Sequence, residues 1–272
     1  MLGIVRTDAT GWGNASTLGA MAAGLALLAV FLLIEGRLAR SPLMPLRIYA
    51  SRTLSAANLV VLLVGGATFG MWFFVSLYLQ QVLGYSPLRA GLAFLPMTLC
   101  IIAGSTFASR ATGRFGAKPL LVCGMLAQTV GLLLFAEVAV NGHYASDMLA
   151  PSLLVAIGIG LSFVPATICA TAGVAPQEAG LASALVNTAR LFGGALGLAV
   201  LAALATAQTN TELHHARAGV QAAHAALTDG FHLAFVVAAG FALLGAAVAM
   251  LGLPRAADRR AATTSPAVAA ES

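Results

Sequence analysis

The residue whose chemistry fits its surroundings least is Arg190, which lies inside the apolar stretch Gly180–Ala207. A guanidinium in a membrane helix cannot face lipid, so it faces protein or a water-filled cavity. Asn187 precedes it by three residues, and Gly194 and Gly197 follow at +4 and +7, which puts all four on one helix face. There Arg190 would hold an anionic group or couple to a proton-carrying carboxylate. The alternative is structural: a clamp on backbone carbonyls, or a side chain that reaches toward the cytoplasm.

A second group of candidates is aromatic. Trp72, Phe73 and Phe74 lie within an apolar stretch that ends with Gln80 and Gln81. Aromatic side chains near a membrane face usually form an interfacial belt. The alternative is a pocket for flat, apolar ligands. The three aromatic residues and the two glutamines, together with Asn187 and Arg190, are the seven residues predicted to line a substrate cavity.

Glycines at helical spacing form a third pattern. Gly66 and Gly70 are four residues apart, as are Gly193 and Gly197, with Gly194 beside them. Such spacing allows two membrane helices to approach closely, so these five glycines are predicted packing residues. A dinucleotide site is excluded for the second set, because no βαβ unit surrounds it.

Signatures of enzymes and of metal sites are missing. The sequence contains neither H-E-x-x-H nor G-x-S-x-G, so we predict neither an enzyme nor a bound cofactor. His214, His215 and His224 lack a carboxylate partner at i,i+4, so no metal site is predicted. Glu137 and Glu178 lie near the ends of apolar stretches. A proton carrier within the membrane, if one exists, must therefore lie elsewhere.

Composition indicates the elements that position these residues. Hydrophobic residues make up 60% of the 272 residues and charged residues 8%, against about 25% charged in globular proteins. Mean hydropathy is +0.93 and the pI is about 9.6. The basic residues lie in short gaps between apolar stretches, which indicates membrane topology rather than a nucleic-acid partner. The lipid bilayer is the predicted environment.

The predicted fold is an all-α polytopic transmembrane bundle. A spanning helix needs about 20 mostly apolar residues, and seven stretches qualify. They are Leu18–Glu35, Leu54–Val82, Arg89–Ser109, Pro119–Val138, Met148–Ala172, Gly180–Ala207 and Gly230–Leu253.

The gaps between these spans indicate the orientation. Ten basic residues fall in one set of gaps and three in the other, which places the N-terminus outside and the C-terminus in the cytoplasm. The residues after Gln208 are predicted to form the longest outside loop. The predicted organisation is an extracytoplasmic segment over 1–17, a linker helix and cytoplasmic loop over 18–53, a six-helix bundle over 54–253, and a disordered cytoplasmic tail over 254–272.

Two long stretches, residues 73–96 and residues 177–197, carry a family resemblance. The first resembles the opening helix pair, and the second the penultimate helix, of the C-terminal bundle in the fourteen-helix drug/proton antiporter branch of the major facilitator superfamily. Between them, Arg114, Gly116 and Lys118 match the family's cytoplasmic loop motif. Gly113 stands where that motif usually has an acidic residue, which puts a charge relay through this loop in doubt.

The resemblance implies a function. The chain would be the C-terminal half of a plasma (inner) membrane transporter, with Leu18–Glu35 as a linker helix. It would export amphiphilic small molecules by alternating access, driven by a proton gradient and completed by an N-terminal half. The alternative is a non-transporting remnant or a membrane interaction module.

Overall fold

The computed structural model describes residues 52–140, 142–171, 178–215 and 219–253, together with Ala26, Val30 and Leu33. The chain divides into two units, Met1–Arg52 and Thr53–Ser272. In the first unit, the three described residues are helical and exposed. Apart from these three residues and residues 52–53, the predicted linker helix and cytoplasmic loop lie outside the described residues, as do the predicted N-terminal segment and the whole of the predicted C-terminal tail.

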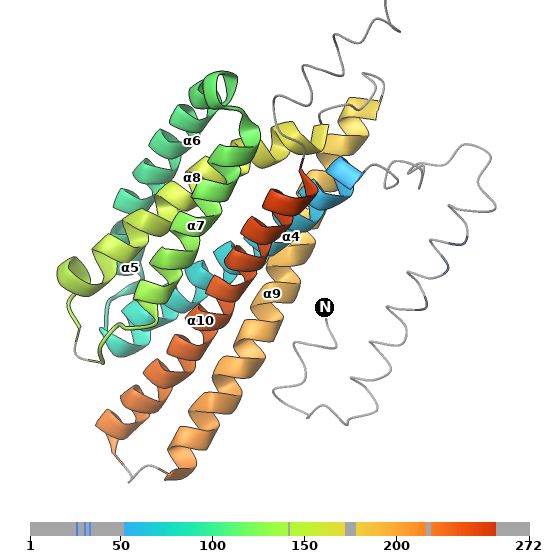
Figure 1. Cartoon of the computed structure of the whole chain (residues 1–272). Coiled ribbons are helices and arrows are strands. Elements are labelled where there is room, and N and C mark those ends of the chain that lie inside the picture. The colour runs from blue at the N-terminus through green and yellow to red at the C-terminus, as the bar shows by residue number, and fades with distance from the viewer. Residues whose placement is uncertain are drawn as a thin grey trace, which may run out of the picture. The chain divides into compact units, whose positions relative to one another are not determined.

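The second unit is built from helices in the part of the chain that the structure describes (Figure 1). Six helical segments there are long and apolar enough to cross a membrane, in agreement with the predicted six-helix bundle. The elements are α4 (Arg52–Leu77), η3 (Tyr78–Val82), α5 (Pro87–Ala93), α6 (Leu95–Phe115), α7 (Ala117–Phe135), η4 (Tyr144–Met148), α8 (Leu149–Thr171), α9 (Ala179–His215) and α10 (Val220–Gly252).

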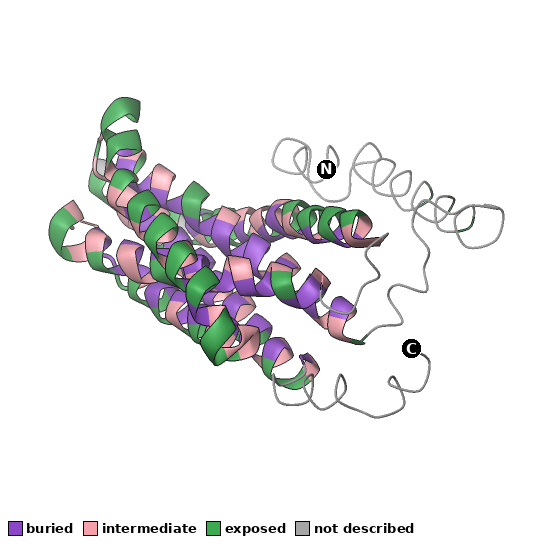
Figure 2. Ribbon diagram, turned by 90° about the horizontal axis from the view of Figure 1, so that it is seen from above, coloured by how far each residue is buried: buried purple, intermediate pink, exposed green. Residues whose placement is uncertain are grey.

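Helix α4 contacts three other helices, α7, α9 and α10. Its Phe74 ring packs against Phe231 and Phe235 of α10, and its Thr68 accepts a hydrogen bond from Gln128 of α7. Helices α7 and α8 pack against each other, as do α6 and α8, α7 and α10, and α9 and α10. Buried residues follow the sides on which the helices face one another, and exposed residues follow the outer sides (Figure 2). Contacts between the apolar side chains on these facing sides thus hold the bundle together.

Local sequence explains where the helices begin and end. Pro87 occupies the first turn of α5, and the Ser86 hydroxyl accepts a hydrogen bond from the Arg89 amide at 3.3 Å, as an N-cap does. Pro96 marks the start of α6 after a break at Phe94. Gly116 has φ 85°, a backbone conformation that favours glycine, and forms the tight turn between α6 and α7.

The prediction that an outside loop begins after Gln208 is wrong. Helix α9 continues to His215, and α10 already begins at Val220. Gln208 donates a hydrogen bond to Glu212 at 3.0 Å within this extension. Hydropathy marks where a helix leaves lipid, whereas polar residues with good i,i+4 partners allow the helix to continue. At about 1.5 Å per residue, both helices are longer than a vertical crossing of about 30 Å requires.

Candidate functional site

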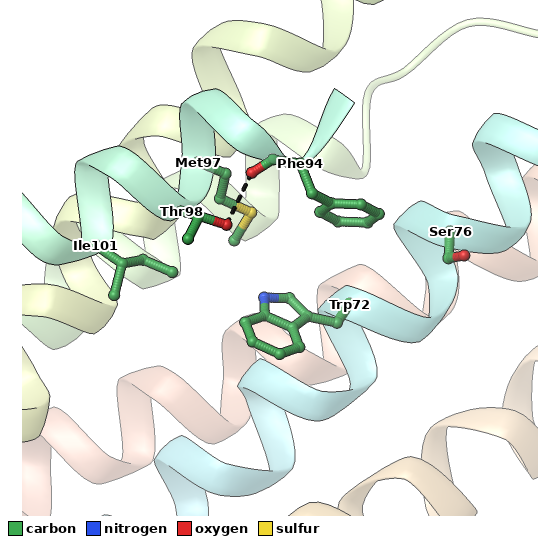
Figure 3. A pocket seen from close by; sticks show the side chains of 6 residues that line it. All are labelled: Trp72, Ser76, Phe94, Met97, Thr98 and Ile101. Atoms are coloured by element: carbon green, nitrogen blue, oxygen red, sulfur yellow. Dashed lines mark hydrogen bonds between the residues drawn. The ribbon is translucent and has the colours of Figure 1, made fainter. Parts of the chain in front are cut away.

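A groove lies on the side of α4 that faces α6 and α8, and it consists of two adjoining pockets. One pocket has a volume of about 380 Å³ and is lined by residues of α4, α6, α8 and α9. The other, of about 310 Å³, lies between α4 and the α5–α6 break. The two share Trp72, Thr98 and Ile101. Figure 3 shows the Trp72 indole facing Phe94, Met97 and Thr98 across the second pocket.

Arg190 lines the larger pocket and is the charged residue among those that line it. It lies about 16 Å along α9 from Ala179, near the middle of a membrane crossing. Its Nη2 donates a hydrogen bond to Asn187 Oδ1 at 2.8 Å, and its Cζ lies 5.2 Å from the centroid of the Phe163 ring. The structure thus brings together Arg190, Asn187 and Trp72, three of the predicted cavity residues, through a direct bond and a shared pocket.

Several lining residues were missed by the sequence analysis. On α4 they are Gly65, Thr68, Phe69 and Ser76, which flank Trp72 in the two pockets. They lie at −7, −4, −3 and +4 from Trp72, and residues at these offsets share one helix face. Helical spacing from Trp72 could therefore have identified them, whereas the partner residues on α6 and α8 depend on tertiary packing.

Phe74 requires a correction to the predicted cavity. Its ring is buried and packs against Phe231 and Phe235, with centroids 5.6 and 6.2 Å away. Successive helical residues are about 100° apart, so Phe74 lies about 200° from Trp72 around the axis. Phe74 therefore belongs to the core between α4 and α10. Phe73 is exposed and does not belong to either pocket.

Gln80 and Gln81 lie beyond the groove, in the π-helical turn η3. Gln80 Nε2 donates hydrogen bonds to the Ser76 carbonyl at 3.2 Å and to Ser76 Oγ at 2.8 Å. Because Ser76 lines the smaller pocket, its hydroxyl connects Gln80 to the rim of that pocket. Gln81 is exposed and lines neither pocket.

The predicted packing glycines all lie where α4 crosses α9, a contact that we call the glycine seam. A Cβ at Gly66 would lie 3.2 Å from the Gly193 carbonyl oxygen and 3.4 Å from Gly197 Cα. A Cβ at Gly193 would overlap the Leu62 carbonyl, and one at Gly194 would lie 2.8 Å from the Phe69 ring. Gly70 faces the Leu201 side chain in the same contact. The two backbones therefore approach too closely for larger residues.

The seam also positions the charged end of the groove. A Cβ at Gly65 would overlap the Arg190 carbonyl, so the α9 backbone at Arg190 lies directly against α4. Gly65 itself lines the larger pocket. The same close approach that joins the helices thus fixes the place from which the Arg190 side chain extends.

The predicted cytoplasmic loop motif makes a structural contact. Lys118 Nζ donates hydrogen bonds to the carbonyl oxygens of Met250 and Leu253, each at 2.6 Å. These carbonyls lie at the C-terminal end of α10, where a cation is favoured by the helix dipole. Arg114 is exposed, and its Cζ lies 5.6 Å from the centroid of the Phe115 ring. Lys118 therefore ties α7 to α10.

Acidic side chains lie away from the groove in the described ranges. Asp147, Glu178 and Glu212 are partly exposed, and Glu137 and Asp229 are exposed. None of the five lines either pocket. Within the described residues the groove therefore offers hydrogen-bond donors, aromatic rings and one positive charge, but no carboxylate.

The sequence also has known relatives. It matches the family model described as Major Facilitator Superfamily over residues 1–198 and 57–269. It is 38% identical to the cephamycin export protein of Amycolatopsis lactamdurans, over 74% of this chain and 41% of the relative. It is 36% identical to the puromycin resistance protein of Streptomyces alboniger, over 88% of this chain and 48% of the relative. For the tetracenomycin C resistance and export protein of Streptomyces glaucescens, the values are 32%, 95% and 55%. This chain spans about half the length of these curated relatives.

Proposed function

This chain belongs to the Major Facilitator Superfamily, and on that premise we propose that it forms the C-terminal half of an exporter of amphiphilic small molecules. Membership indicates a multi-pass membrane transporter rather than an enzyme. The relatives whose names refer to export or resistance support efflux as the direction of transport. Because the chain spans about half of their length, the complete activity needs a second bundle.

The observation that carries the proposal is the groove beside α4. Aromatic and aliphatic side chains line most of it, while Arg190 supplies a charge near mid-membrane. Apolar pockets with a few polar groups are the usual form of small-molecule sites. An amphiphile would place its apolar body against Trp72 and its polar group near Arg190. Facing an N-terminal bundle, this groove would be one wall of the substrate cavity.

Alternating access would follow from a rocking motion of the two bundles around that cavity. In this chain, α6 is the helix suited to face the cavity, because Met97, Ala108 and Ala111 are its buried residues and its other side chains are partly or fully exposed. The glycine seam would keep α4 and α9 together as one body during the motion.

Proton coupling would depend on the partner half. A proton-driven carrier needs a titratable group inside the membrane, and the described acidic residues lie away from the groove. We therefore place the proton-carrying carboxylate in the N-terminal half. The proton gradient, rather than a bound cofactor, would be the driving force.

The proposed location is the inner (plasma) membrane, with the N-terminus outside and the C-terminus in the cytoplasm. The structure supports this assignment in one respect. Lys118 lies at the same end of the bundle as the C-terminal end of α10, and Arg110 and Arg114 precede it in the same region of chain. Basic residues thus gather at the end that the positive-inside rule assigns to the cytoplasm.

The test uses the protein recovered from its own membranes with an antibody against residues 256–272. Its mass would first be compared with the 27.5 kDa of this chain, and the protein would then be reconstituted into liposomes with an imposed pH gradient. A larger mass, with transport of amphiphilic dyes that collapses when a protonophore is added, is the expected result. A 27.5 kDa species that binds no partner and moves no dye would contradict the proposal and favour a remnant.

A further inference from the structure

The groove is chemically one-sided, which restricts what it can bind. Its polar lining groups in the larger pocket are the Arg190 guanidinium, the Trp72 indole N–H, and the hydroxyls of Thr68, Thr98 and Ser105. A guanidinium and an indole N–H only donate hydrogen bonds. Among the residues that the structure describes, no acidic side chain lines the pocket. Its chemical complement is therefore an acceptor that carries negative charge.

Arg190 has unused bonding capacity. A guanidinium has five N–H donors, and within the described residues Arg190 donates to Asn187 alone, at 2.8 Å, and forms no ion pair. The Phe163 ring covers one side of the guanidinium at 5.2 Å. The groups that bond it are therefore neutral. A charge near mid-membrane is costly without an opposite charge, so an anion that enters the pocket would relieve that cost.

Thr68 supplies a second donor, and Gln128 orients it. Thr98 uses its hydroxyl hydrogen within its own helix, donating to the Phe94 carbonyl at 3.0 Å. Thr68 instead accepts a hydrogen bond from Gln128 Nε2 at 3.1 Å. That bond occupies an acceptor position on the hydroxyl oxygen and leaves its hydrogen free to donate. Gln128 is fully buried behind Thr68, so it acts as a positioning residue.

The walls favour a flat ring. Phe69 and Trp72 come from α4, and Phe163 comes from α8, all lining the larger pocket. Aromatic rings pack favourably against other aromatic rings in offset or edge-to-face geometry. The smaller pocket continues this apolar surface toward Phe94 and Met97 (Figure 3). A ligand with its acid at Arg190 would extend its ring system along Trp72 toward this second pocket.

We propose that the groove selects aromatic acids: a substrate carboxylate binds the Arg190 guanidinium, the Thr68 hydroxyl held by Gln128 donates to the same group, and the ring packs against Trp72. This inference rests on the proposed function and names the substrate class of the same site. A guanidinium binds a carboxylate through two parallel hydrogen bonds, which an uncharged amide cannot reproduce. The groove should therefore discriminate between an acid and its neutral amide.

The same carboxylate chemistry could come from an acidic residue of the N-terminal half. Binding to the purified chain of 272 residues separates the two sources, because that half is then absent. The probes are para-nitrobenzoate and para-nitrobenzamide, which differ in charge but share one ring. Both quench tryptophan emission, and Trp12→Phe would leave Trp72 as the reporter, since the chain has two tryptophans.

We expect the chain to bind para-nitrobenzoate about tenfold more tightly than para-nitrobenzamide, as hydrogen bonds to charged groups allow. Arg190→Gln should reduce that ratio to about one while amide binding persists. Arg190→Lys should keep part of the preference, because the charge remains and the two parallel bonds are lost. The matched control is Arg89→Gln, since Arg89 also lies over an aromatic ring, at 3.9 Å from the Tyr85 centroid, but outside both pockets. It should leave the ratio unchanged.

Thr68→Val and Gln128→Met test the second donor. Valine has nearly the shape of threonine, so Thr68→Val should lower the preference for the acid by about threefold to tenfold without changing amide binding. Gln128→Met should lower it by less, because the hydroxyl remains but loses its orientation. A role in packing alone would weaken both probes equally, which would contradict the assignment to these two residues.

Equal affinity of the unaltered chain for acid and amide would overturn the inference. This comparison uses only the unaltered chain, so its result does not depend on whether a variant folds. Transport of neutral dyes by the native protein would meanwhile leave the proposed export function intact. Conversely, acid-selective binding that depends on Arg190, in a protein that transports nothing, would support the site and contradict the transporter. The two proposals can therefore fail separately.

Discussion

The two sides of α4 illustrate opposite uses of a membrane helix. On the glycine seam, Gly66 and Gly193 allow the α9 backbone to lie directly against α4, and no larger residue fits. On the groove side, Trp72 and Thr68 border pockets of about 310 and 380 Å³. Gly65 belongs to both sides, since it contacts the Arg190 backbone and lines the larger pocket. Close packing on one side therefore determines where the charge lies on the other.

The largest expected effect comes from breaking the seam. In Gly193→Ala the added methyl group would overlap the Leu62 carbonyl. This carbonyl belongs to the backbone, so it cannot rotate away as a side chain could, and the helix itself would have to shift. Overpacking costs about 1–3 kcal/mol, and more when backbone must shift. We expect a clear fall in the thermal unfolding temperature of the protein in detergent. Gly240→Ala is the matched control, because a Cβ there meets no atom of the described residues within 4 Å. Equal unfolding temperatures for the two variants would contradict the seam.

Changing the groove should affect binding and not stability. Trp72 and Phe73 are neighbours on α4 with similar exposed fractions, 48% and 41%, yet Trp72 lines the pockets and Phe73 does not. Trp72→Ala should weaken binding of para-nitrobenzoate about tenfold, the loss of one aromatic contact. Phe73→Ala should weaken it by less than about twofold. Calorimetric titration measures both, and a larger loss for Phe73→Ala would remove Trp72 from the site.

The hydrogen bonds of Lys118 at the end of the bundle should contribute less to stability than the glycine seam does. Lys118→Met removes the two bonds to the Met250 and Leu253 carbonyls. We expect a loss of about 1 kcal/mol, typical for a cation at a helix C-terminus, and faster amide hydrogen exchange in the last turn of α10. Arg114→Met is the control, because Arg114 is exposed and contacts the neighbouring Phe115 ring. Unchanged exchange in Lys118→Met would show that these hydrogen bonds contribute no stability.

The smallest expected effect on stability is at Gln128. Its Nε2 donates a hydrogen bond to Thr68, but its Oε1 is buried and has no hydrogen-bond partner among the described residues. In Gln128→Met the lost bond and the removed orphan oxygen offset each other. The free energy of unfolding should therefore change by less than about 1 kcal/mol, as measured by thermal unfolding. A fall as large as that of Gly193→Ala would mean that Gln128 holds α4 and α7 together.

Sequence alone predicted the six described spans, because hydropathy and length report directly on what lipid requires. The glycines at i,i+4 also indicated which faces approach closely. The groove could be predicted in part. Arg190 and Trp72 stand out by residue type, whereas Thr98, Ile101 and Phe163 are ordinary residues that become lining residues through helix packing. Phe74 was misplaced because adjacency in sequence does not mean adjacency on a helix face.

The central claim is that the groove side of α6 faces a water-accessible cavity in the complete transporter. Cysteine labelling tests it directly, in native-length protein whose native cysteines, including the three of this chain, are replaced by alanine. Ile102 lines the larger pocket, and Leu133 is a comparably exposed residue of α7 outside the groove. The account predicts that a membrane-impermeant maleimide labels Ile102→Cys, that para-nitrobenzoate slows this labelling, and that Leu133→Cys stays unreactive. Labelling of Ile102→Cys no faster than that of Leu133→Cys would place this face in lipid and contradict the account.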